Sequence, residues 1–170
     1  GSFNNYLNAK NRILEANKLI TENSPFEIFK IITGNNYQGS IQLQDLINLP
    51  HRLEKIIINN RAVIINDSKS TNTDSLKYAL SKVSDDSSLH LILMGNPDKE
   101  RYDSFLLSRP QYLYICGKHA EQLSNKIDHH NKSIFKSLED TLKHINHNFS
   151  GNVEILFSPG NPSGRDYKNF

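Results

Sequence analysis

A block of seven polar residues in the middle of the chain holds the densest set of chemically useful side chains. It reads "NDSKSTN", from Asn66 to Asn72, and combines a carboxylate at Asp67, a cation at Lys69, three hydroxyls and two amides. An acid directly after a strand is the type of residue that hydrogen-bonds a ribose diol. Thr71 and Asn72 are typical N-cap residues, and the N–H groups at a helix start attract anions. The block indicates a ligand site rather than an ordinary surface loop.

Two further polar blocks and a His-Arg pair could act with it. "MGNPDKERYD" carries Lys99, and "SPGNPSGRDYKNF" carries Ser163 and ends at Phe170. Upstream, "LPHRLE" places His51 and Arg52 directly after a proline, which stiffens the approach to them. Each block alone is better explained as a capped loop with solvated charges. If all three lie on one edge of a sheet, beside His-Arg, a binding site is the better explanation.

The elements that position these blocks follow from the hydrophobic pattern. Short apolar runs are typical of buried parallel strands, and they alternate with helical patterns; the runs are 89–95, 112–117 and 152–158, and the helices 73–83, 118–127 and 137–145. "EKIIINNRAVIIND" is typical of a hairpin. The alternation predicts an α/β fold with a Rossmann-like, mostly parallel sheet and helices on both faces. In such sheets ligands bind beyond the carboxyl ends of the strands, where the polar blocks fall.

The region before residue 46 is less regular. Residues 4–20 predict an amphipathic helix, and the pattern weakens from there to residue 45. The segment Gly34-Asn35-Asn36 lacks the lysine and the spacing of a phosphate loop. We therefore expect that the chain cannot hold a triphosphate unaided.

The bulk composition narrows the function classes. A net charge of +2 gives no basic field of the kind that nucleic-acid binders show. One cysteine suits a reducing cytosol, and no apolar run approaches the roughly 20 residues of a membrane helix. We expect a cytoplasmic monomer that binds neither nucleic acid nor membrane. The histidine pairs lack a zinc-ligand pattern, so no metal site is predicted.

The polar motifs resemble, in order and spacing, those of the C-terminal domain of the Mur ligase family. "LPHRLE", "NDSKSTN", "GNPDK" and "SPGNPSGRDYKNF" carry this resemblance over residues 46–170, although Asn96, Pro97, Pro162 and Gly164 depart from the family's usual residues. The start "GSFNNYLNA" is similar to the last long helix of the family's central ATPase domain. The resemblance implies that residues 1–45 end that ATPase domain and that residues 46–170 form the C-terminal domain.

The resemblance also implies an activity in peptidoglycan synthesis, and so in cell shape and cell division. The motifs look most like those of members that add D-glutamate to UDP-N-acetylmuramoyl-L-alanine with ATP and Mg²⁺, through an acyl phosphate. By this resemblance Arg52, with His51 beside it, meets the phosphates, and Lys99 assists the reaction. The nucleotide would contact Asn5, Asn8, Arg52, Asp67 and Lys69. D-glutamate would contact Thr71, Lys99, Ser163 and Phe170.

Two alternatives remain open from the sequence. One is another amino-acid ligase of the same superfamily, such as a folylpolyglutamate synthase. The other is a non-catalytic binding module that kept this domain after losing its ATPase partner. On the favoured hypothesis the phosphate loop and most magnesium ligands belong upstream, and these 170 residues alone are inactive.

Overall fold

The computed structural model describes residues 49–59, 62–83, 88–98, 102, 107–149 and 152–163. All of them belong to one compact unit, Asn48–Phe170. The predicted N-terminal helix and the region 1–45 lie outside the described residues, as do Asn5, Asn8, Lys99 and Phe170.

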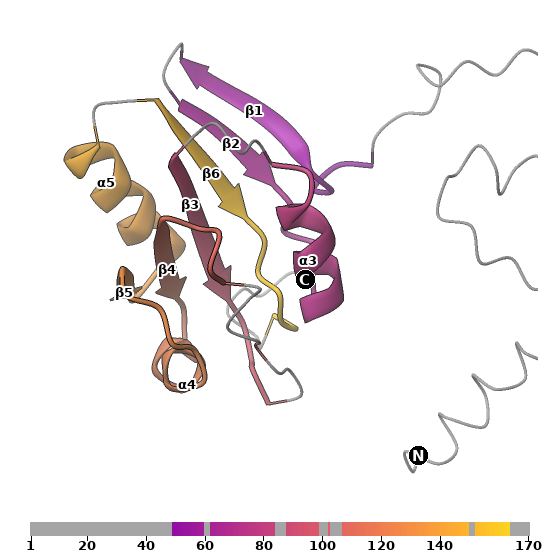
Figure 1. The fold of residues 1–170 in the computed structure, drawn as a ribbon, viewed down its shortest axis with the longest axis vertical. Helices are drawn as coiled ribbons and strands as arrows, with labels where there is room; N and C mark the ends of the chain where they lie inside the picture. Colours follow the sequence, from indigo (N-terminus) through magenta and orange to yellow (C-terminus); the bar gives the residue numbers. More distant parts are fainter. Residues whose placement is uncertain are drawn as a thin grey trace, which may run out of the picture. The chain divides into compact units, whose positions relative to one another are not determined.

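A six-stranded sheet forms the centre of this unit (Figure 1). Its strands are β1 (Glu54–Asn59), β2 (Ala62–Asn66), β3 (Ser88–Met94), β4 (Tyr112–Cys116), β5 (Lys132–Phe135) and β6 (Val153–Phe157), in the spatial order β1-β2-β6-β3-β4-β5. The pair β1–β2 is antiparallel and every other neighbouring pair is parallel. The predicted hairpin and the mostly parallel sheet are both confirmed.

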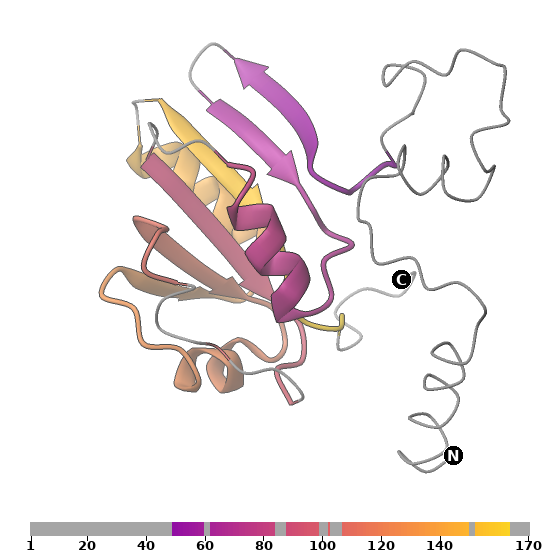
Figure 2. The ribbon, with the colours of Figure 1, turned by 45° about the vertical axis from the view of Figure 1, so that its right-hand side comes forward.

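Three helices in the described region cover the two faces of the sheet (Figures 1 and 2). They are α3 (Thr73–Leu80), α4 (Ala120–Asn125) and α5 (Leu138–Asn148). The side-chain oxygen of Asn72 accepts a hydrogen bond from the backbone N–H of Ser75 at 2.8 Å, which caps α3. Ser137 caps α5 in the same way through Asp140. The three helices predicted over residues 73–83, 118–127 and 137–145 are present, although α3 and α4 end earlier than the pattern suggested.

Two cores lie on opposite faces because successive side chains of a strand alternate between them. On one face α3 and α4 contribute Leu76 and Leu123, which pack with Leu91 and Leu113. On the other face Ile145 of α5 packs with Ile92 and Tyr114. The long apolar strands are thus covered on both sides where helices lie over them.

The register of three neighbouring strands fixes where the polar blocks begin. Val153 at the start of β6 pairs with Ala62 of β2 on one side and Ser88 of β3 on the other. The three strands run parallel, so their carboxyl ends reach the same edge of the sheet (Figure 2). This arrangement brings the segments after β2, β3 and β6 together, as the sequence predicted.

Candidate ligand site at the carboxyl edge of the sheet

The His-Arg turn precedes β1 and has an unusual backbone. His51 has a φ of 65° and Leu53 a φ of 51°, in the left-handed region that residues other than glycine rarely adopt. Backbone hydrogen bonds hold the turn: Arg52 N–H donates to the carbonyl of Leu49, and Lys69 N–H donates to that of His51, both at 3.3 Å. Such a conformation persists where its surroundings over-determine it, often at functional sites. The hydrogen bond from Lys69 attaches the turn to the polar block after β2.

The block after β2 folds back on itself before α3 begins. Asp67 N–H donates to the carbonyl of Phe157 at 2.8 Å, which extends the β2–β6 ladder by one residue. Ser70 N–H then donates to the carbonyl of Asp67 at 2.9 Å. These bonds turn the chain so that Thr71 is exposed at the entrance to α3, while Asp67 is buried.

Asp67 has a different environment from the one that its sequence position suggested. Its side chain is only 6% exposed, and its Oδ2 accepts a hydrogen bond from the hydroxyl of Ser158 at 2.9 Å. Burial raises the pKa of Asp67, although hydrogen bonds from Ser158 and the backbone of Leu53 and the charge of Arg52 oppose the rise. The buried carboxylate of Asp67 therefore joins the segment after β2 to the segment after β6 through its hydrogen bond with Ser158.

Asn161 holds the segment after β6 against the end of β3. Its side chain is 1% exposed, and its Nδ2 donates to the carbonyls of Met94 at 3.0 Å and Pro159 at 2.9 Å. Its Oδ1 accepts a hydrogen bond from the hydroxyl of Tyr102. All three polar positions of the amide are satisfied inside the protein, so the loop has one well-defined position.

A close backbone contact reinforces this junction. Asn96 N–H donates to the carbonyl of Pro162 at 2.8 Å, and Gly160 N–H donates to that of Ser70 at 3.1 Å. Gly95 has a φ of 99°, and a Cβ at that position would overlap the carbonyl oxygen of Pro162. Glycine is therefore required there for both conformation and space. Pro162, a departure from the Mur ligase motif, accepts this bond and lies at the junction.

A cavity of about 960 Å³ opens beside these segments. Its polar lining comes from the His-Arg turn, the block after β2 and the segment after β6, and includes His51, Arg52, Asn66, Ser68, Lys69, Thr71, Asn161 and Ser163. Its apolar lining comes from the sheet and α5, and includes Ile56, Ile64, Ile155, Phe157, Leu138 and Leu142. The cavity combines convergent polar groups with an apolar wall, as small-molecule sites commonly do.

The structure brings together five of the predicted site residues and leaves one apart. His51, Arg52, Lys69, Thr71 and Ser163 all line the cavity. Asp67 is not among its lining residues and lies beneath the loops. Which ligand each residue contacts remains a prediction, and so do the roles of Asn5, Asn8, Lys99 and Phe170, which lie outside the described residues.

Three residues at or beside this site were given no role of their own in the sequence analysis: Glu54, Asn66 and Asn161. Their importance lies in contacts across the fold. Glu54 and Asn66 face each other because Glu54 pairs with Asn66 in the β1–β2 hairpin. That pairing could have been derived from a hairpin register, whereas the contacts of Asn161 with Met94 and Tyr102 depend on tertiary packing alone.

Within the described ranges, no helix has the length and apolar character needed to cross a membrane. No group of three or more His, Cys, Asp or Glu side chains in those ranges is arranged to hold a metal ion.

Solved structures of ligases have a similar fold. UDP-N-acetylmuramate–alanine ligase MurC from Thermotoga maritima superposes with a TM-score of 0.59 and 13% identity, covering 94% of this chain and 35% of the other. The bifunctional folylpolyglutamate synthase/dihydrofolate synthase from Yersinia pestis superposes with a TM-score of 0.53 and 15% identity, covering 85% and 39%. At identities of 13% and 15%, these similarities show a shared fold and nothing about function.

The sequence relatives of this chain share one enzyme name. The UDP-N-acetylmuramoylalanine–D-glutamate ligase of Buchnera aphidicola from Baizongia pistaciae is 31% identical over 131 residues, which is 75% of this chain and 29% of the relative. The enzyme of the same name from Baumannia cicadellinicola is 31% identical over 133 residues, or 76% and 30%. No family model matches the chain. By sequence the chain is similar to part of these Mur ligases, with which it shares the fold, and it spans about 30% of the length of these relatives.

Proposed function

We propose that this chain is the C-terminal part of an ATP-dependent ligase that adds D-glutamate to UDP-N-acetylmuramoyl-L-alanine in the cytoplasm. The observation that carries the proposal is a single cavity at the carboxyl edge of the sheet. The His-Arg turn and the polar segments after β2 and β6 all line it. The names of its sequence relatives supply the reaction. Residues 1–45 would then end the ATP-binding domain, and residues 46–170 would form the C-terminal domain.

The cationic side of the cavity suits phosphate. Arg52 and Lys69 lie on its rim together with His51, and these are the side-chain types that bind phosphoryl oxygens. ATP supplies the phosphoryl group that activates the carboxylate of the muramoyl-alanine substrate. Arg52 and Lys69 would neutralise the charge that develops on the transferred group, and His51 would donate a hydrogen bond beside them.

The hydroxyl side of the cavity suits a carboxylate. Thr71 is exposed at the start of α3, where the helix N-terminus favours negative charge, and Ser163 reaches the same cavity from the segment after β6. Together they would orient D-glutamate so that its amine can attack the activated carboxyl group. By resemblance, Lys99 and Phe170 would complete this carboxylate site.

The remaining roles are also proposed by resemblance. Asn5 and Asn8 would lie near the adenine, and Asp67 near the ribose. Contact of Asp67 with a ribose requires the covering loop to shift, because its carboxylate is buried and accepts a hydrogen bond from Ser158. No carboxylate is among the described residues that line the cavity, so the ligands of Mg²⁺ would come from elsewhere in the enzyme.

The alternatives from the sequence differ in how well they are supported. The fold is shared with a folylpolyglutamate synthase, so it does not choose the amino-acid acceptor. The curated relatives at about 31% identity, however, carry the name of the D-glutamate ligase. The same names favour an enzyme over a non-catalytic module.

Kinetics of two single variants test the assignment of the two sides. In a protein that carries the ATP-binding part ahead of these residues, Ser163→Ala should raise the KM for D-glutamate about tenfold and leave that for ATP nearly unchanged. Lys69→Ala should do the reverse.

Two matched controls accompany this experiment. Lys77→Ala removes an exposed cation of α3 that does not line the cavity, and Ser81→Ala removes an exposed hydroxyl just after α3. Both should leave the two KM values unchanged. Exchange of the effects of Ser163→Ala and Lys69→Ala would show that the two sides are wrongly assigned.

A further inference from the structure

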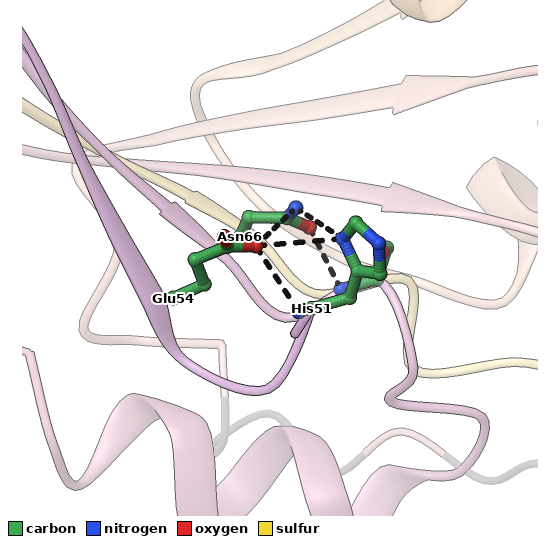
Figure 3. Close-up of polar contacts among 4 residues, drawn as sticks. His51, Glu54 and Asn66 are labelled. Carbon is green, nitrogen blue, oxygen red and sulfur yellow. Dashed lines mark hydrogen bonds and ion pairs between the residues drawn. The ribbon is translucent and has the colours of Figure 1, made fainter. Parts of the chain in front are cut away.

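His51 is held by a small hydrogen-bond network beside the cavity (Figure 3). The Nδ1 atom of its ring lies 2.9 Å from the amide nitrogen of Asn66 and 3.4 Å from Oε2 of Glu54. Its backbone N–H also donates to Oε2 of Glu54, at 3.1 Å. Figure 3 shows that the other ring nitrogen, Nε2, lies on the far side of the ring from both neighbours.

The orientation of the Asn66 amide is determined by its neighbours. Its Oδ1 accepts a hydrogen bond from the backbone N–H of Ser68 at 3.2 Å, so oxygen must lie on that side. Its Nδ2 then carries two protons toward two acceptors, Oε2 of Glu54 at 3.3 Å and Nδ1 of His51. Flipping the amide would lose the bond from Ser68 and place two acceptor oxygens against each other.

This orientation determines which ring nitrogen carries the proton. Nδ1 of His51 accepts a hydrogen bond from Nδ2 of Asn66 and therefore carries no proton, because a proton on Nδ1 would face the amide proton. The neutral ring then carries its proton on Nε2. Glu54 does not reverse the choice, because its Oε2 already accepts from the His51 backbone and from Asn66.

The backbone around His51 also restrains the position of its ring. His51 adopts a left-handed conformation that a non-glycine residue rarely takes, and its carbonyl is tied to Lys69 N–H in the block after β2. Glu54 and Asn66 lie on paired strands, so the network rests on rigid elements rather than on a loop. The ring is thus held at the cavity wall by its hydrogen bond with Asn66.

We propose that Asn66, oriented by Ser68 and Glu54, fixes His51 in the Nε2-protonated tautomer, so that His51 presents a neutral N–H donor to a phosphate oxygen in the cavity. Asn66 and Glu54 are then positioning residues that act through His51. The phosphate part of this inference rests on the proposed function, whereas the tautomer does not. A neutral donor would add direction to the charge that Arg52 supplies at the same rim.

Nitrogen NMR of the ring on this 170-residue chain tests the tautomer directly. The spectrum is recorded at about pH 8, where an ordinary imidazole is neutral, and the His51 signals are identified by their loss in His51→Gln. The inference expects a proton on Nε2 and none on Nδ1. A proton on Nδ1, or a mixture of both tautomers, would overturn it.

A charge-neutral exchange supplies the matched variant. Glu54→Gln combined with Asn66→Asp keeps the net charge of the network but replaces the donor at residue 66 with an acceptor. The proton should then move to Nδ1. Glu54→Gln alone keeps the Asn66 donor and should keep the Nε2 tautomer. If the double variant leaves the proton on Nε2, Asn66 does not set the tautomer.

Kinetics of the same variants test the ligand. In a protein that carries the ATP-binding part, the double variant should raise the KM for ATP about tenfold and leave the KM for D-glutamate unchanged. An unchanged KM for ATP would overturn the phosphate contact. If the wild-type protein catalyses no ligation, the proposed function fails, while the NMR result still decides the tautomer.

Discussion

At the scale of single residues, buried polar side chains determine the shape of the candidate site more than the exposed ones. Asn161 is the clearest case, because one amide joins the end of β3, the segment after β6 and Tyr102. Asp67 does the same between the segments after β2 and β6 through Ser158. The exposed residues that would contact ligands depend on these internal connections for their position.

Asn161→Ala should therefore destabilise the domain strongly. The substitution removes a buried amide and its hydrogen bonds with the carbonyls of Met94 and Pro159 and with the hydroxyl of Tyr102. We expect a loss on the order of 2 to 4 kcal/mol in the free energy of unfolding, measured by urea denaturation. Ser163→Ala, two residues away on the exposed rim, should change it by less than about 0.5 kcal/mol. Equal effects would contradict this role for Asn161.

His90 should make the stability of the domain depend on pH. Its side chain is 0% exposed, its Nδ1 lies 3.0 Å from the hydroxyl of Tyr114, and its ring stacks on Tyr112. Burial lowers the pKa of His90 from 6.5 to about 4. Between these two values the histidine is protonated in the unfolded chain and neutral in the folded one. The contribution of His90 to the free energy of unfolding is therefore fully present above about pH 6.5. It falls by on the order of 3 kcal/mol as the pH drops toward 4.

Unfolding of His90→Gln across this pH range tests the assignment. The variant should lose most of the decline between pH 6.5 and 4, while His147→Gln, which removes an exposed histidine of α5, should retain it. Burial raises the pKa of Asp67, which contributes the opposite sign near pH 4. The comparison between variants therefore isolates His90 better than the wild-type curve does. An undiminished decline in His90→Gln would assign it to other groups.

At the scale of elements, the sheet and its connections could be predicted from sequence because each strand signal is local. The apolar runs of β3, β4 and β6 and the polar tip of the β1–β2 hairpin identify the strands, and their alternation with helices implies a parallel sheet. Strand β5 was missed because "KSIF" is short and has only two apolar residues, which suits its place at the sheet edge. The polar blocks were placed correctly because parallel strands share a carboxyl edge.

The rest of the site depends on contacts that no local pattern encodes. The burial of Asp67 follows from how the segment after β6 covers it, and its position directly after a strand gave no sign of this. The network around His51 requires the left-handed turn and the hairpin register together. Sequence could therefore indicate which residues approach the edge, but not which of them face the cavity.

The contact between the segments after β3 and β6 gives a prediction at this scale. Gly95→Ala should destabilise the domain by about 2 kcal/mol or more, because the added Cβ overlaps the carbonyl of Pro162 and the positive φ strains alanine. Asp98→Ala, an exposed change in the same segment, should lie within about 0.5 kcal/mol of wild type. Urea midpoints measure both. A Gly95→Ala variant as stable as Asp98→Ala would show that the two segments can separate freely.

At the scale of the whole molecule, the proposed function makes the cavity one side of an active site. The cavity holds cationic and hydroxyl groups, but the described residues offer no phosphate loop and no carboxylate on its lining. Relatives of which the match covers 29% and 30% bear the name of the D-glutamate ligase. The proposed function therefore requires a protein in which an ATP-binding part precedes these residues.

The most direct test of this account is the acceptor dependence of phosphate release from Mg-ATP. A protein that carries the ATP-binding part should release phosphate only when UDP-N-acetylmuramoyl-L-alanine and D-glutamate are both present, and the 170-residue chain alone should release none above background. Release that instead requires a folate and L-glutamate would contradict the assigned reaction. So would turnover by the 170 residues alone, or the absence of any D-glutamate-dependent release from the longer protein.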